Sequence, residues 1–131
     1  MTKISIHNKN IYYETYGKGE PLVLLNGIMM STASWSPFIK AFSKNYKLFL
    51  IDFIDMGQSD KAEESYTQNM HVEFLKEVFD KLNFEKVNMV GVSYGGEVAI
   101  QFAIKYGERL NSLILANTTS YTFNGLKDIG A

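Results

Sequence analysis

The chain has 131 residues, 46% of them hydrophobic, which suffices for one domain with a substantial core. Its net charge is −1 and no long run of one sign occurs, so neither nucleic acid nor an anionic membrane is expected as a partner. The absence of cysteine excludes a disulfide framework, and two histidines, His7 and His71, argue against a histidine-rich metal site. No apolar run approaches the ~20 residues of a membrane span and no signal-peptide pattern opens the chain. We therefore expect a cytoplasmic protein without a metal or organic cofactor.

The first third of the chain predicts a hairpin, a strand and a helix. Residues 3–16 alternate apolar and polar side chains around turn-forming residues at positions 8–10, which is typical of a β-hairpin. The continuous apolar run 22–25 predicts a strand that is buried on both faces. A helix through residue 42 follows, with Ser36 as its N-cap and Pro37 at its first position.

The rest of the chain alternates short apolar runs with segments of helical periodicity. The expected elements are a strand at residues 48–51, a helix capped by Thr67, a strand at 87–92, a helix from Tyr94 to Tyr106 that stops at Gly107, and a strand at 113–116. A hairpin followed by alternating strands and helices predicts an α/β fold. We expect a mostly parallel, twisted sheet of about six strands, with three helices on both of its faces.

The stretch Gly91-Val92-Ser93-Tyr94-Gly95 lies between a predicted buried strand and a predicted helix. A serine in this place is held in a sharp turn at the carboxyl end of the strand, and small residues two before and two after it let strand and helix approach. The helix N-terminus beside it offers free N–H groups and the positive end of a dipole to a developing oxyanion. The pattern indicates a nucleophile elbow with Ser93 as the nucleophile.

With this elbow, the chain resembles the α/β-hydrolase superfamily, in its serine-nucleophile branch, over about residues 4–119. Asn26-Gly27 stands where the family usually has His-Gly, and residues 52–60 resemble its Asp-x-x-Gly-x-Gly-x-Ser-Asp loop. Residues 84–96 resemble the family's approach to its nucleophile, and residues 110–118 resemble its sixth strand. Asp55 replaces the first glycine of the residue 52–60 loop, which we interpret as a variation of the loop and not as a catalytic acid.

The resemblance also implies roles for individual residues. The oxyanion hole would use the backbone N–H groups of Tyr94 and Ile28, so the change from histidine to Asn26 is tolerable there. Asn26, Gly27 and Trp35 are expected to lie at a small-molecule substrate, and Trp35 can serve in the core as well.

The family's acid and histidine normally follow its seventh and eighth strands, whereas no histidine follows Ser93 here. We therefore expect residues 1–131 to form one domain that corresponds to the N-terminal half of the family fold, without its lid and last two strands. His71 could replace the missing base only within hydrogen-bond reach of the serine, and its place beside the apolar face of a helix favours a structural role. His7, in the hairpin, is less favoured still.

Two hypotheses about function remain. In the first, Ser93 attacks an ester, lactone or thioester to give an acyl-enzyme, and a second chain supplies the acid and the histidine. That chain, or a second copy of this one, would also cover the apolar strand Leu113–Ala116, which we expect at an open edge of the sheet. In the second, the protein is a non-catalytic binding or interaction protein derived from a hydrolase.

Overall fold

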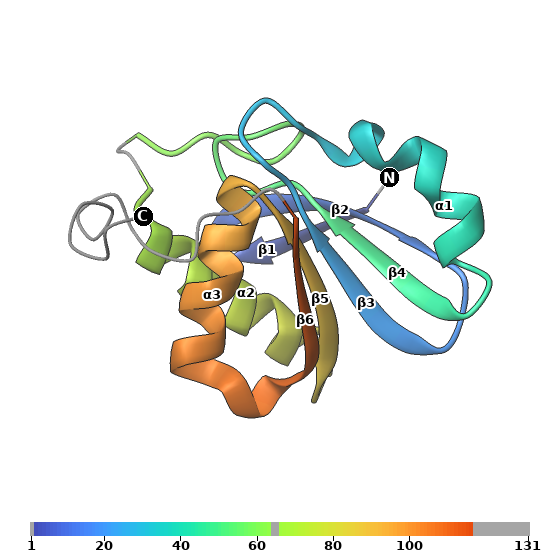
Figure 1. The fold of residues 1–131 in the computed structure, drawn as a ribbon. Helices are drawn as coiled ribbons and strands as arrows, with labels where there is room; N and C mark the ends of the chain where they lie inside the picture. Colours follow the sequence, from blue (N-terminus) through green and yellow to red (C-terminus); the bar gives the residue numbers. More distant parts are fainter. Residues whose placement is uncertain (1, 64–65, 117–131) are drawn as a thin grey trace, which may run out of the picture.

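A computed structural model describes residues 2–63 and 66–116 of the chain (Figure 1). It contains one six-stranded sheet, three α-helices and two short 3-10 helices. In chain order they are β1 (Thr2–Ile6), β2 (Lys9–Tyr16), β3 (Glu20–Leu25), η1 (Thr32–Trp35), α1 (Ser36–Phe42), β4 (Tyr46–Ile51), α2 (Gln68–Lys81), β5 (Val87–Val92), α3 (Tyr94–Tyr106), η2 (Gly107–Arg109) and β6 (Leu110–Ala116). The predicted fold class, strand number and helix number are confirmed.

The strands lie in the order β1-β2-β4-β3-β5-β6. β1, β2 and β4 pair antiparallel, whereas β4, β3, β5 and β6 run parallel. The chain leaves β3 toward β4 by way of α1 and leaves β5 toward β6 by way of α3, so the connections diverge from two neighbouring strands. In open α/β sheets such a switch point, at the carboxyl ends of the strands, is where ligands bind.

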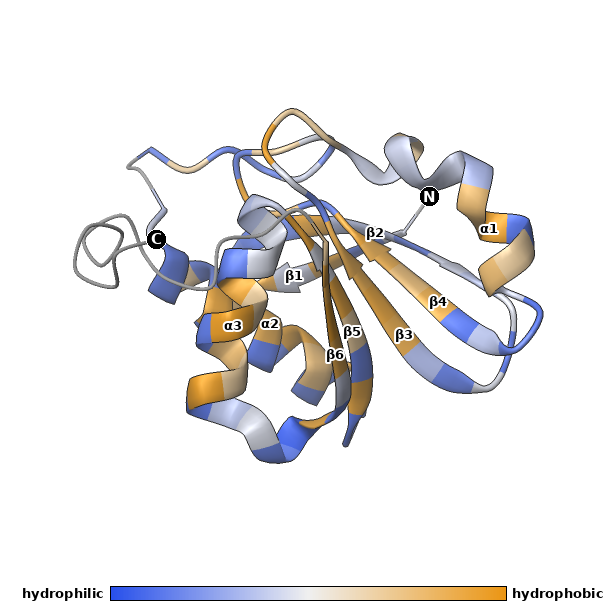
Figure 2. Cartoon of the chain, in the orientation of Figure 1, coloured by the Kyte–Doolittle hydropathy of each residue, from blue (hydrophilic) through white to orange (hydrophobic). Residues whose placement is uncertain are grey.

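The central strands are buried on both faces, as their continuous apolar runs predict. Along β3 and β4, alternate residues belong to two separate apolar clusters. Val23 and Phe49 lie in the larger cluster, which includes the buried faces of α2 and α3. Leu24 and Leu50 lie in the smaller one, against which α1 packs. Figure 2 shows the apolar strands between helices that lie on opposite sides of the sheet.

Thr67 caps α2 as predicted, since its hydroxyl accepts a hydrogen bond from the Met70 N–H at 3.1 Å. The predicted cap of α1 is wrong, because Ser36 is the first helical residue and Trp35 is the N-cap. The preceding 3-10 helix already bends the chain into helical geometry, so no serine side chain is needed at this start. None of the described helices is long and apolar enough to cross a membrane.

The hairpin turn also differs from the prediction at residues 8–10. His7 and Asn8 form it, with φ angles of 49° and 66°, and β2 already begins at Lys9. Two successive residues with positive φ make the type of turn whose twist matches that of the flanking strands. The pairing of Ile4 with Ile11 then keeps both side chains in the core, which fixes this register.

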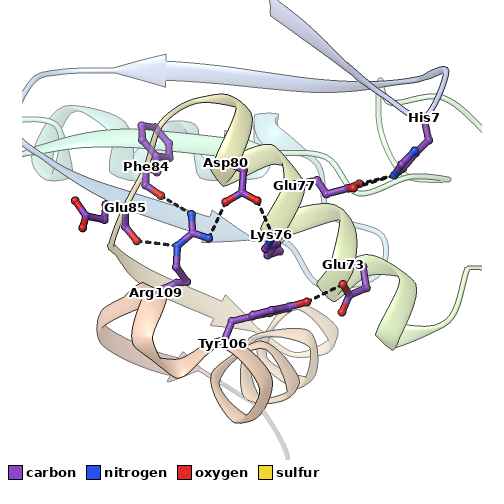
Figure 3. A network of polar contacts seen from close by, with 9 residues as sticks. All are labelled: His7, Glu73, Lys76, Glu77, Asp80, Phe84, Glu85, Tyr106 and Arg109. Atoms are coloured by element: carbon purple, nitrogen blue, oxygen red, sulfur yellow. Dashed lines mark hydrogen bonds and ion pairs between the residues drawn. The ribbon is translucent and has the colours of Figure 1, made fainter.

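A polar network on the surface joins α2 to the end of α3 and to η2 (Figure 3). The Arg109 guanidinium donates to Asp80 at 2.7 Å and to the backbone oxygens of Phe84 and Glu85 at 2.7 and 2.8 Å. Two turns of α2 away, the Tyr106 hydroxyl donates to Glu73 at 2.7 Å. These contacts fix α3 against α2, and α3 carries the elbow at its other end.

Candidate active site

Ser93 sits between the last residue of β5 and the first residue of α3, with φ 51° and ψ −114°. A non-glycine residue at positive φ is uncommon, and such strain is concentrated at functional sites. The turn is secured by backbone hydrogen bonds from the Ser93 N–H to the Ala116 oxygen and from the Gly96 and Glu97 N–H groups to the Ser93 oxygen, at 2.9–3.1 Å. The side chain of Ser93 is exposed. This is the geometry of the predicted elbow.

The glycines on either side of the serine are required by close backbone approach. A Cβ added to Gly95 would lie 2.5 Å from the backbone oxygen of Leu25 in β3. A Cβ added to Gly91 would lie 2.6 Å from the Gly96 Cα. The strand, the helix and the neighbouring strand therefore meet without room for a methyl group, as the motif predicts.

Replacing Gly95 with alanine should destabilise the fold by about 1–3 kcal/mol, because the methyl group meets backbone atoms that cannot rotate away. Gly107→Ala is the matched control, since Gly107 has φ −56° and no atom lies within 4 Å of the added Cβ. Urea unfolding of both variants measures the difference. Equal stability of the two variants would show that the elbow is looser than described.

The loop after β3 approaches the elbow through Gly27. A Cβ at Gly27 would lie 3.2 Å from the Ser93 Cβ, and the Met30 N–H donates to the Gly27 oxygen at 3.2 Å to close a tight turn. Ile28 and Met29 form the tip of this turn, with Met29 at φ 73°. Tyr94 is the first residue of α3, so its N–H has no partner within the helix. The segments that carry the Ile28 and Tyr94 N–H groups thus meet at Ser93, and their role as an oxyanion hole stays a prediction.

Asn26 and Trp35 do not line the cavity at the elbow, although we expected them at the substrate. The Asn26 side chain is fully buried, accepts a hydrogen bond from the Trp35 indole at 2.6 Å, and donates to Asp52 at 3.0 Å. Asp52 in turn accepts from the N–H groups of Thr32 and Gln58 at 2.9 and 3.0 Å. The geometry therefore favours a positioning role for both residues, since they join the loop after β3 to the loop after β4.

Burial raises the pKa of the Asp52 carboxyl, and its three hydrogen-bond donors oppose that shift. The carboxylate leaves no space for a side chain at position 57, where an added Cβ would lie 2.2 Å from Asp52 Oδ2. Gly57 also has φ 51°, so both sterics and backbone conformation explain the glycine that the family loop carries here.

A cavity of about 720 Å³ opens above the carboxyl ends of the central strands. Three segments form most of its lining, namely residues 28–31, residues 54–57 and the start of α3, with Tyr66 and His71 completing it. Each of the three segments has a non-glycine residue at positive φ. Met29 and Asp55 line the cavity, and Ser93 directly precedes the lining residue Tyr94. Within the described residues, no group of three His, Asp or Glu side chains could hold a metal ion.

Comparison with known proteins agrees with this architecture. Residues 20–129 match a family model described as the alpha/beta hydrolase fold. The chain belongs to the α/β-hydrolase family. Among solved α/β-hydrolases, an enzyme from a Medee basin deep-sea metagenome library is 45% identical, with a TM-score of 0.90 over 98% of this chain and 48% of that chain.

Two further relatives of this α/β-hydrolase chain are enzymes by name. The meta-cleavage product hydrolase CumD of Pseudomonas fluorescens is 28% identical, with a TM-score of 0.88 over 95% of this chain and 47% of that chain. The uncharacterized carboxylesterase nap of Bacillus subtilis is 37% identical over 93 residues, which make up 70% of this chain and 31% of the esterase. The chain thus spans less than half the length of each of these relatives.

His71, for which the sequence favours a structural role, lies in the wall of the cavity. It lies in the first turns of α2, is 3% exposed, and its ring centroid lies 4.8 Å from that of Phe53 and 5.9 Å from that of Tyr94. Burial lowers its pKa from the ordinary 6.5 to about 4, against the opposing effect of the Asp55 carboxylate. The only sequence signal of this position is a polar residue on the apolar face of a helix.

The buried His71 predicts a loss of stability in mild acid. Its folded-state pKa lies below its unfolded-state pKa, so the unfolded chain takes up the proton first as the pH falls. Stability should therefore fall by about 3 kcal/mol between about pH 6.5 and pH 4, at 1.36 kcal/mol per unit. His71→Leu should remove this part of the slope. Urea unfolding at several pH values gives the free energy of unfolding of the two proteins. If it depends on pH in the same way in both, the burial of a neutral His71 ring is contradicted.

Proposed function

We propose that the protein is a serine hydrolase that cleaves an ester, lactone or thioester through an acyl-enzyme on Ser93. The strained turn of Ser93 at the carboxyl end of β5, in a chain of the α/β-hydrolase family, carries this proposal. The exposed side chain and the adjoining cavity of about 720 Å³ support it, since a carbonyl substrate needs access to the serine oxygen.

In the proposed reaction, the Ser93 oxygen attacks the carbonyl carbon and its proton passes to a base. The N–H groups of Tyr94 and Ile28 stabilise the negative charge on the carbonyl oxygen. The alcohol or thiol then leaves with the proton from the base, and the acyl group stays on Ser93. Water attacks the acyl-enzyme in the second half of the cycle, which releases the acid and restores the serine.

The base and the acid that orients it are proposed to come from polypeptide outside residues 1–131. His7 lies on the surface with its Nε2 at 2.7 Å from a carboxylate oxygen of Glu77, and burial makes His71 a weak base. The relatives extend to about twice the length of this chain or more, so they contain the additional polypeptide that this proposal requires.

The names of the relatives support hydrolysis as the class of reaction. They include an uncharacterized carboxylesterase and a meta-cleavage product hydrolase. The same fold carries both, so the fold alone does not select the bond. The proposal is limited to acyl transfer from oxygen or sulfur because a serine elbow with two converging N–H segments is suited to that step.

Labelling with a fluorophosphonate probe tests the proposal, because the probe reacts with an activated serine. We expect an adduct on the Ser93 peptide when the chain is combined with the polypeptide that completes its sheet, and little adduct on residues 1–131 alone. Absence of an adduct in both preparations would contradict the hydrolase proposal. It would favour the second hypothesis, a binding protein derived from a hydrolase.

The edge strand β6 is proposed as the contact with that polypeptide. Ile114 and Leu115, which point to opposite faces of the sheet, are 56% and 40% exposed. An apolar strand at the end of a sheet is a template for another strand, and β6 is the last strand of the sheet that the described residues form. We expect backbone amides of β6 to gain protection from hydrogen exchange when the second polypeptide is added. Unchanged exchange there would place the contact elsewhere.

A further inference from the structure

The imidazole of His71 is a buried polar group whose needs are not met within the described protein. The side chain is 97% buried, and its ring contacts are with the aromatic rings of Phe53, Tyr66 and Tyr94. No hydrogen bond among the described residues uses its ring nitrogens. They are not among the fully enclosed polar atoms that lack a partner, so they are open to the cavity and can take a hydrogen-bond partner there. Because His71 lines the cavity, a molecule in the cavity can supply that partner.

The electrostatics of the wall select the kind of partner. Burial keeps the imidazole neutral at physiological pH, so one nitrogen donates and the other accepts. Asp55, which also lines the cavity, is the charge that acts on His71, and it repels anions from the same space. A neutral oxygen, as in a hydroxyl or a ketone, therefore suits His71 better than a carboxylate or a phosphate.

His71 lies close to the first residue of α3 in the cavity wall. Its ring centroid lies 5.9 Å from that of Tyr94, the residue directly after Ser93. Met30 and Met56 contribute flexible apolar surface to the same cavity. A molecule in the cavity can thus contact His71 and the first residue of α3 at once, with its apolar body against the two methionines.

We propose that His71 is a specificity residue that binds a hydroxyl or ketone oxygen of the substrate, separate from the carbonyl that Ser93 attacks. The substrate class is therefore a hydroxy- or oxo-substituted acyl ester or lactone. The inference rests on the proposed function, which places the acyl group of the substrate in this cavity. Its test measures binding, which does not depend on the activation of Ser93.

The test compares ethyl levulinate, an ester with a ketone in its acyl chain, with ethyl valerate, which lacks the ketone. Binding is followed by NMR titration in a Ser93→Ala background, so that neither ester is consumed. We expect about five- to tenfold tighter binding of the levulinate, which is the effect of one hydrogen bond of about 1–1.4 kcal/mol. His71→Phe should abolish this preference while it retains valerate binding, because the phenyl ring fills the same space without a polar atom.

Two control variants sharpen the outcome. His71→Gln retains a donor and an acceptor and should restore part of the preference, whereas His7→Phe replaces an exposed histidine and should leave the preference unchanged. Equal binding of the two esters, or an equal preference in His71→Phe, would overturn the inference. Either result would leave fluorophosphonate labelling of Ser93 unaffected, so it is distinguishable from a failure of the proposed function.

Discussion

Ser93→Ala is expected to reduce ester hydrolysis by a factor of about 10³–10⁶ in the protein combined with the polypeptide that completes its sheet. The alanine removes the hydroxyl oxygen to which we assign the acyl bond, whereas the cavity and the segments that carry the Tyr94 and Ile28 N–H groups remain. The expected change is a loss in kcat, with substrate binding nearly unchanged, as measured with p-nitrophenyl butyrate. Ser5→Ala, in the exposed part of β1, is the matched control and should retain full activity. Retained hydrolysis in Ser93→Ala would place the nucleophile elsewhere.

Substitutions at position 93 also separate backbone strain from chemistry. Serine and alanine are equally strained at φ 51° and ψ −114°, whereas glycine adopts these angles readily. Ser93→Gly should therefore be about 1–2 kcal/mol more stable than Ser93→Ala, although both are inactive. Urea unfolding measures the difference. Equal stability would mean that the turn is relaxed and that strain has no part in presenting the serine.

Asp52→Ala is expected to destabilise the protein by about 3–5 kcal/mol, the largest effect on folding that we predict. The change removes the acceptor of the Thr32 and Gln58 N–H groups. It also removes one of the two acceptors of the buried Asn26 amide, which keeps only its hydrogen bond to the Ile51 oxygen. Because these donors belong to the loops after β3 and β4, the loss should also loosen the turn that carries Ile28.

Asp60→Ala is the matched control for Asp52→Ala. Its carboxylate accepts one hydrogen bond, from the Asn10 N–H at 2.7 Å, and lies nearer the surface. We expect a cost of about 1 kcal/mol for this control. Thermal and urea unfolding compare the two variants, and similar losses in both would mean that the Asp52 network contributes no more than an ordinary loop contact.

The sheet could be predicted from the sequence because its signals are local. Runs such as Leu22–Leu25 and Leu48–Ile51 are apolar at every position, and only a strand covered on both faces uses such a run. The turn between β1 and β2 could not be placed, since His7 and Asn8 are as polar as the residues after them. The register in which β1 pairs with β2 decides which residues form the turn, and that register is a non-local property.

The elbow could also be predicted, because most of the atoms that force its shape lie within residues 91–97, with further contacts from the neighbouring strands β3 and β6. The direction of the Asn26 side chain could not, since it depends on Asp52 and Trp35, which are distant in sequence or separated by a turn. The same holds for His71, whose place in the cavity wall depends on how α2 packs under the loop after β4. Local sequence thus defines the turn at Ser93, whereas tertiary packing defines its surroundings.

Trapping of the acyl-enzyme tests the central claim most directly. The protein, combined with the polypeptide that completes its sheet, is quenched in acid during turnover of p-nitrophenyl butyrate, and its peptides are analysed by mass spectrometry. We predict a butyryl group on the peptide that contains Ser93, which disappears with time as water releases it. Turnover without a covalent adduct, or with the adduct on another residue, would contradict the assignment of Ser93 as the nucleophile.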